Sequence, residues 1–246
     1  MSPAFSVRKL DPSTAVTASN PGSLPEMDAI RGLYYFLDLF TTVVTGHDPE
    51  DPGATHIGPF FGSTVVAALL GGEVYVAETT DTKKIIGCAV WFGPGHTLFD
   101  TPEQQQHALG PLMASFNKEL QAWWLTTFLP KYDSFLASTL SEGTKHAAWH
   151  LQTLAVDPEY QQKGAGRLLV NAIVDKAAPT KTALCVECST ETNIEVYTKM
   201  GFHLMPKDNS GPDSCKATYT GVKGHSVPIS LVVPVLRYGD SKNLVE

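Results

Sequence analysis

The segment that decides the fold is Trp149-His-Leu-Gln-Thr-Leu-Ala-Val-Asp-Pro-Glu-Tyr-Gln-Gln-Lys-Gly-Ala-Gly-Arg-Leu-Leu169. Its mostly apolar first part, which ends at Val156, predicts a buried strand. An Asp-Pro pair then turns the chain, and the Gln-x-x-Gly-x-Gly loop from Gln161 to Gly166 opens a helix. A helix start offers unpaired backbone N–H groups and the positive end of the helix dipole, and the glycines let phosphate oxygens approach closely. The segment therefore predicts an anion site between a strand and a helix.

Two other phosphate-binding loops do not fit this segment. A dinucleotide-binding loop needs a third glycine where Leu169 stands, and its ribose-binding acid should follow a strand, whereas Glu187 lies inside one. A P-loop needs Gly-Lys followed by Ser or Thr, which the segment lacks. A tight strand-to-helix turn without a ligand stays open as the alternative.

The rest of the chain predicts strands that alternate with helices. We expect strands at 5–10, 73–78, 85–92, 147–156, 182–188, 202–205 and 229–236. We expect helices at 28–40, with Asp28 as N-cap, at 60–70, at 164–176 and at 192–200. We also expect two or three helices broken at Pro130 over about 97–145, and a polar connection over 207–224. Because no linker divides the chain, residues 1–246 are expected to form a single α/β domain.

Composition excludes several classes of protein. The 246 residues are 43% hydrophobic and 17% charged, which is typical of a folded chain and not of a disordered one. A formal net charge of -7 disfavours a nucleic-acid partner. The N-terminus lacks the pattern of a signal peptide, and no apolar run is long enough to cross a bilayer. We expect a cytoplasmic protein with no membrane partner.

The cysteines are expected to be plain buried side chains. Cys88, Cys185, Cys188 and Cys215 are too few for a disulfide framework in a chain of this length. Cys185 and Cys188 form a C-x-x-C, but residues three apart on a strand point to opposite faces. No metal site is predicted.

Two motifs give the chain a specific resemblance. The Gln161–Gly166 loop after a buried strand resembles motif A of the GNAT superfamily, the GCN5-related N-acetyltransferases. The stretch Asn193-Ile-Glu-Val-Tyr-Thr-Lys-Met-Gly-Phe202 resembles motif B of that family. Together they cover 147–205. The resemblance implies the GNAT fold, a mixed central sheet flanked by helices, and leaves 97–145 as a helical insertion.

The resemblance implies acetyl-CoA as acyl donor, held where the strands 149–156 and 182–188 part. Asn193 and Tyr197 are four residues apart on a helix and so share a face, independently of the resemblance. Carried over residue by residue, the cofactor-binding set is Leu154, Ala155, Val156, Gln161, Gln162, Lys163, Gly164, Ala165, Gly166, Arg167, Asn193 and Tyr197.

The implied reaction is direct transfer of an acetyl group to a primary amine. An amine with a pKa near 10.4 is mostly protonated at pH 7, and freeing its lone pair costs about 4–5 kcal/mol, so a general base is useful. His150 is one candidate, with Gln152 on the same strand face; a core histidine bonded to backbone is its alternative. Glu187 is the rival base, or else a carboxylate satisfied by Arg167 or backbone donors. Tyr197 is the candidate proton donor to the departing thiolate.

The acceptor is expected to be a small molecule. Trp123 and Trp124 lie in the insertion and would line its pocket, or else belong to the core, and Tyr34 and Tyr35 on the first helix are further candidates. A protein lysine or N-terminal acetyltransferase and a non-catalytic acyl-CoA-binding module remain alternatives. A monomer or a homodimer is compatible with the sequence.

Overall fold

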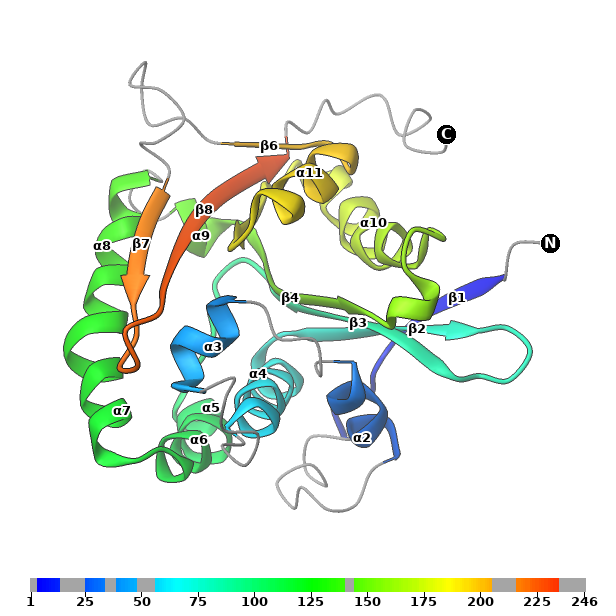
Figure 1. The fold of residues 1–246 in the computed structure, drawn as a ribbon. Helices are drawn as coiled ribbons and strands as arrows, with labels where there is room; N and C mark the ends of the chain where they lie inside the picture. The colour runs from blue at the N-terminus through cyan, green and yellow to red at the C-terminus, as the bar shows by residue number, and fades with distance from the viewer. Residues whose placement is uncertain are drawn as a thin grey trace.

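One mixed sheet runs through the molecule (Figure 1). The computed structural model describes residues 4–13, 25–33, 39–47, 56–139, 144–204 and 216–234. The strands lie in the order β1-β2-β3-β4-β5-β8-β6, and β7 also pairs with β8. Their bounds are β1 Phe5–Lys9, β2 Glu73–Thr79, β3 Ile85–Phe92, β4 Trp149–Val156, β5 Leu184–Cys188, β6 Phe202–Leu204, β7 Lys216–Thr220 and β8 Ser226–Pro234. Among these, β4 and β5 pair in parallel and the other pairs are antiparallel.

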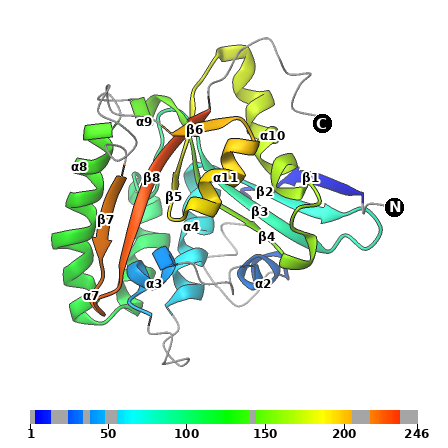
Figure 2. The same cartoon turned by 45° about the horizontal axis from the view of Figure 1, so that its top comes forward.

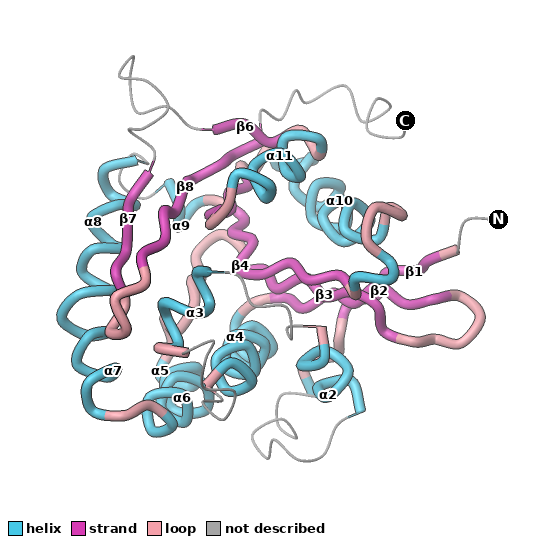
Figure 3. The backbone as a smooth tube through the Cα atoms, in the orientation of Figure 1, coloured by secondary structure: helices cyan, strands magenta, loops and turns pink. Residues whose placement is uncertain are grey.

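Helices cover both faces of the sheet (Figures 1 and 3). α10 (Ala165–Ala177) packs on β1 to β4, and α11 (Glu191–Lys199) packs beside it on β5 and β6. α2 (Pro25–Gly32) and α4 (Ile57–Gly71) cover β2 and β3 from the opposite face, and α3 (Leu39–Thr45) contacts β8. Short 3-10 turns, η3 (Pro158–Tyr160) and η4 (Ala178–Thr180), flank α10.

The insertion is a chain of short helices beside β7 and β8 (Figure 1). Its elements are α5 (Pro102–Gln104), η1 (Gln105–Leu109), α6 (Gly110–Ser115), α7 (Lys118–Trp123), η2 (Trp124–Phe128), α8 (Leu129–Thr139) and α9 (Thr144–Ala147). Trp123 and Lys131 attach it to β7 by donating to the carbonyl oxygens of Thr220 and Thr218. The helical insertion is therefore confirmed, with slightly different ends.

The expected break at Pro130 is wrong. The helix continues from α7 through η2 into α8, and η2 is a π-helical turn that ends two residues before Pro130. A second π turn, η1, likewise ends two residues before Pro111. A proline removes an N–H donor and crowds the carbonyl group four residues earlier, and a wider turn relieves both problems without ending the helix.

Three apolar clusters form the core. One lies between α2, α4 and the strands β2 and β3. Another lies between α10, α11 and β3 to β5. The third joins α3, the insertion and β7–β8, and its aromatic rings include Phe60, Trp124 and Phe128. The insertion therefore shares a core with the sheet and is not a separate lid.

Two other expectations need correction. α2 begins at Pro25, so Asp28 lies in its first turn and is not its N-cap. The connection expected over 207–224 contains β7, whose alternating half-buried pattern Lys-Ala-Thr-Tyr-Thr is too polar to be identified without its partner β8. None of the helices in the described ranges combines the length and apolar character needed to span a bilayer.

Candidate active site

The strands β4 and β5 part in the middle of the sheet. Trp149–Leu151 pair with Leu184–Val186, and within the described chain the pairing stops there although β4 continues to Val156. Figure 2 shows β5 turning away from β4 toward β8. The backbone of Leu154 to Val156 therefore has no β5 neighbour, and an extended ligand could pair with it as an added strand.

A bulge in β4 lies at the point where the strands part. Val90 of β3 pairs with Thr153 and Trp91 pairs with Leu151, so Gln152 is left without a partner on β3. A bulge of this kind kinks the strand and redirects its side chains. The parting of β4 from β5 thus follows directly after a kink in β4.

The loop after β4 has the backbone expected of an anion site. Gly164 has a φ of 94°, and Gln162, which is not a glycine, also has a positive φ of 59°. Left-handed residues turn neighbouring N–H groups to one side, as in backbone sites that bind anions. A Cβ added to Gly164 would meet nothing within 4 Å, so the loop faces open space. α10 starts immediately afterward, and its first-turn N–H groups face this loop.

The charged side chains of the loop are engaged with the backbone in this structure. Lys163 donates to the carbonyl oxygen of Glu159, and Arg167 donates to that of Lys199 on α11. Gln161 donates to the carbonyl oxygen of Val156, which ties the loop to the end of β4. Their roles toward a cofactor phosphate stay predictions.

The helix α11 presents the two motif B residues. Thr190 caps it by accepting from the backbone N–H of Asn193. Tyr197 is 8% exposed and packs against Phe202. Burial, with Cys188 and Glu187 nearby, raises the pKa of Tyr197 above its ordinary value. Tyr197 therefore keeps its proton in the neutral range and can donate a hydrogen bond.

A cavity of about 240 Å³ lies beside the parted strands. Its polar lining residues include Gln152 from β4 and Glu187 from β5, so it opens onto the point where these strands separate. The other lining residues are Phe40, Phe60, Thr97, Leu98, Phe99, Trp124, Phe128, Leu129, Tyr132, Asp133, Leu136, Lys145, Ser189 and Ile229. The cavity is smaller than the roughly 300–1,000 Å³ typical of drug-sized ligands, which suits a small acceptor.

Glu187 is the centre of a buried polar cluster. Its Oε2 lies 2.5 Å from Nε2 of His150. Its Oε1 accepts from the Tyr132 hydroxyl at 3.0 Å and from Nζ of Lys145 at 3.2 Å. Lys145 also donates to the Tyr132 oxygen at 2.6 Å. Three side chains thus satisfy Glu187, in place of the Arg167 or backbone donors considered from the sequence.

The cluster keeps Glu187 ionised. Burial opposes its charge, but His150, Lys145 and the hydroxyl of Tyr132 outweigh that cost and hold the pKa of Glu187 well below its ordinary value of 4.5. The side chains of Glu187 and Lys145 are 13% and 15% exposed, so solvent screens this pair little. The cavity floor therefore carries a permanent carboxylate.

His150 is neutral and lies beneath Glu187. It is 1% exposed, and burial lowers its pKa below 6.5 despite the carboxylate beside it. Its Nδ1 has no hydrogen-bond partner among the described residues. An imidazole with the proton on Nε2, donated to Glu187, leaves Nδ1 as an acceptor and explains that unpaired atom. His150 does not line the cavity and reaches it through Glu187.

The lowered pKa of His150 predicts a pH-dependent stability. Between that pKa and 6.5 the unfolded chain binds a proton that the folded chain does not, so the free energy of unfolding should fall as pH decreases below about 6.5. His150→Gln keeps an N–H for Glu187 and should lessen this dependence, whereas the exposed control His146→Gln should retain it. Urea unfolding at pH 7.5 and pH 5.5 measures how much free energy of unfolding each protein loses between the two pH values. An equal loss in wild type and in His150→Gln would show that His150 does not cause the pH dependence.

Only some of the residues predicted to contact the acceptor line the cavity in the structure. Trp124 lines the cavity and donates its Nε1 to the carbonyl oxygen of Val44. Trp123 stacks on Phe128 outside the lining. Gln152 lines the cavity, but the bulge separates it from the buried His150. Tyr34 and Tyr35 lie outside the described residues.

Sequence reasoning missed Tyr132 and Lys145. Both lie in or next to the insertion, far along the chain from Glu187, and neither belongs to a motif. The only signal was indirect: a carboxylate inside a buried strand needs cationic or hydrogen-bonding partners. The sequence does not say which side chains supply them.

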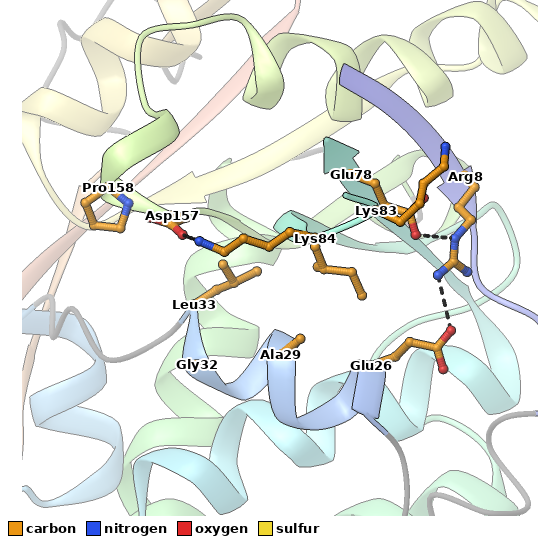
Figure 4. A pocket seen from close by; sticks show the side chains of 11 residues that line it. Arg8, Glu26, Ala29, Gly32, Leu33, Glu78, Lys83, Lys84, Asp157 and Pro158 are labelled. Carbon is orange, nitrogen blue, oxygen red and sulfur yellow. Dashed lines mark hydrogen bonds and ion pairs between the residues drawn. The ribbon is translucent and has the colours of Figure 1, made fainter. Parts of the chain in front are cut away.

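A larger cavity, about 840 Å³, lies between α2 and the strands β1 to β3 (Figure 4). Arg8 contacts Glu78 at 2.7 Å and Glu26 at 3.1 Å, and Lys84 contacts Asp157 at 3.0 Å. These charges are already paired, and no residue of β5 lines this cavity. Its size therefore does not make it the reaction site, and we place the chemistry in the smaller cavity.

The described residues contain no cluster of His, Cys, Asp or Glu able to hold a metal ion. Cys88, Cys185 and Cys188 are buried and form no disulfide within the described residues, and Cys215 lies outside those residues. Burial raises the pKa of Cys185 and of Cys188 to about 12, so both remain thiols near neutral pH.

Comparison with known structures agrees with this architecture. The chain is similar to the crystal structure of mosquito arylalkylamine N-acetyltransferase like 5b, with a TM-score of 0.55 and 16% identity over 94% of this chain and 99% of that chain. It is similar to arylalkylamine N-acetyltransferase 2 from Aedes aegypti, with a TM-score of 0.57 and 10% identity over 93% and 97%. Drosophila melanogaster polyamine N-acetyltransferase gives a TM-score of 0.50 and 14% identity over 94% and 99%.

At these identities the structures show the fold alone, and a search of curated proteins finds no match. The model of the acetyltransferase (GNAT) family, however, matches residues 68–202, which is more than half of the 246 residues. That match runs from the end of α4 to the first residue of β6, and so includes the parted strands, the loop before α10 and the helix α11. The chain therefore belongs to the acetyltransferase (GNAT) family and is an N-acetyltransferase.

Proposed function

We propose that the protein transfers an acetyl group from acetyl-CoA to the primary amine of a small molecule. The observation that carries the proposal is the position of Glu187, an ionised carboxylate in a small cavity beside the parted strands. A carboxylate there can bind an ammonium group next to the backbone that would hold a thioester. The similar structures named above are N-acetyltransferases of arylalkylamines and a polyamine, which supports an amine acceptor.

The residues around the parted strands fit acetyl-CoA. Unpaired backbone of Leu154 to Val156 would bond the pantetheine arm, and the loop from Gln161 to Arg167 would hold the pyrophosphate. Asn193 and Tyr197 would face the arm from α11. Bound there, acetyl-CoA would supply the activated acetyl group as a thioester.

Side chains and backbone groups of the protein then bind the amine and remove its proton. Glu187 binds the ammonium and orients it, and its carboxylate, which accepts a hydrogen bond from Nε2–H of neutral His150, receives the proton that the amine must lose. Because the pKa of Glu187 is held low, the carboxylate is a weak base, and His150 orients it by donating Nε2–H. The N–H of Ala155 or Val156 would stabilise the developing oxyanion.

Tyr197 would stabilise the leaving sulfur by a hydrogen bond. Its raised pKa makes full proton transfer to a thiolate with a pKa near 8.5 uphill, but leaves the O–H available as a donor. This refines the role expected from the sequence, in which Tyr197 gives up its proton.

Release of free thiol from acetyl-CoA in the presence of an amine panel tests the proposal. We expect acceptor-dependent thiol release with small amines and a much slower reaction with lysine-bearing peptides. Faster turnover of peptides would favour a protein acetyltransferase. Acetyl-CoA binding without thiol release for any acceptor would favour the non-catalytic module.

A further inference from the structure

The cavity beside the parted strands has a simple charge balance. Its described lining residues include two carboxylates, Glu187 and Asp133, and one ammonium group, that of Lys145. Tyr132 also lines it and stays neutral, because burial and Glu187 raise its pKa well above 10. His150 beneath Glu187 is neutral as well. The described lining therefore carries one net negative charge.

The two carboxylates are not equivalent. Lys145 already neutralises Glu187 at the cavity floor, at 3.2 Å. Asp133 is on an exposed part of α8 and has no ion-pair partner within the described residues. An arriving ammonium group therefore meets Asp133 at the exposed side of the cavity and shares Glu187 with Lys145 at the floor.

Aromatic side chains form the walls between these two ends. Phe40 and Phe60 have ring centroids 6.4 Å apart, and Phe60 lies 6.2 Å from Trp124. Trp124 and Phe128 are 5.0 Å apart, and Phe128 returns to Phe40 at 6.3 Å. These four rings come from α3, α4 and the π turn η2. They make a continuous apolar surface that offers no carboxylate to a second cation.

From this arrangement we propose that the acceptor is a primary amine with a single positive charge on an aromatic or bulky apolar body, and that Lys145 sets this preference against polyamines. The proposal rests on the function proposed above. A second ammonium group would bring two positive charges to a lining that carries one net negative charge, so one of them would stay unbalanced. A cation–π contact with the rings recovers only a small part of the cost of burying an unbalanced charge, so the second charge is rejected.

Competition between matched amines tests the preference. Hexylamine and 1,6-diaminohexane have the same chain and differ in one charge, and 2-phenylethylamine adds the aromatic body. We expect kcat/KM at least tenfold higher for hexylamine than for the diamine, and higher still for 2-phenylethylamine. Equal or greater turnover of the diamine would overturn the inference while leaving the proposed function intact. Absence of thiol release with every amine would overturn both.

Two charge variants test whether Lys145 sets the preference for a single charge and whether Asp133 binds the arriving ammonium group. Lys145→Met leaves two net negative charges and should raise the relative kcat/KM of the diamine at least fivefold, whereas Lys118→Met, an exposed lysine in the same insertion, should leave the ratio unchanged. Asp133→Asn should raise the KM for hexylamine, with Glu119→Gln as its control. Because a competition ratio does not depend on the active enzyme concentration, a partly unfolded variant remains informative. An unchanged ratio in Lys145→Met would show that Lys145 does not set the preference.

Discussion

Replacement of Glu187 by glutamine is expected to lower kcat/KM for an accepted amine by about 100- to 1,000-fold. The amide cannot bind an ammonium group as an ion pair, and it cannot accept the proton of the amine. The affinity for acetyl-CoA should change little, because Glu187 faces the acceptor cavity. Thiol release measures the first effect, and calorimetric titration with acetyl-CoA measures the second.

The matched control for this substitution is Glu191→Gln. Glu191 is largely exposed and bridges only to Lys216 among the described ion pairs, so its loss should leave turnover unchanged. Glu187→Gln should also lower the free energy of unfolding by about 1–3 kcal/mol, since Lys145 loses its counter-ion. A folded Glu187→Gln enzyme with normal kcat/KM would remove Glu187 from the mechanism.

Replacement of Gly164 by alanine is expected to weaken acetyl-CoA binding at least tenfold. Gly164 has a φ of 94°, which costs an L-residue about 1–2 kcal/mol, and its added Cβ would point into the open space where we place the pyrophosphate. A thermal shift titration measures the affinity. Wild type at a ligand concentration one hundredfold above Kd should gain about 2.7 kcal/mol, and the variant should gain much less at that concentration.

Gly224→Ala separates strain from binding. Gly224 has a φ of 80° in the turn between β7 and β8, and a Cβ there would also meet nothing within 4 Å. Both variants should therefore lose similar stability without ligand, but only Gly164→Ala should lose affinity for acetyl-CoA. Equal affinities in the two variants would mean that the loop before α10 does not hold the cofactor.

The elements around the proposed cofactor site were predictable, because local patterns specify them. The strand before Asp157, the glycine loop and the Asn193–Tyr197 face each follow from neighbouring residues, and the structure places them together. The parting of β4 from β5 was expected only from the family resemblance. In the structure, a bulge at Gln152 lies where the strands part, and no pattern of residues predicts that bulge.

The acceptor side was less predictable, because contacts distant in sequence create it. Glu187 was recognised as a candidate, but its partners Lys145 and Tyr132 come from the insertion. The course of that insertion was misjudged at Pro130, where a π turn keeps the helix continuous and places Trp124 and Phe128 on the cavity. The hydrogen bonds of Trp123 and Lys131 that attach the insertion to β7 also join residues distant in sequence, and the local sequence does not encode them.

We propose that acetyl-CoA lies between β4 and β5, with its pyrophosphate on the loop before α10. Backbone amide hydrogen exchange with and without acetyl-CoA tests it most directly. We expect slower exchange in peptides that span residues 152–168, and no change in α2 or in β7–β8. Unchanged exchange over 152–168 would contradict this position of acetyl-CoA. Protection confined to α2 and the residues around the larger cavity of Figure 4 would contradict it as well.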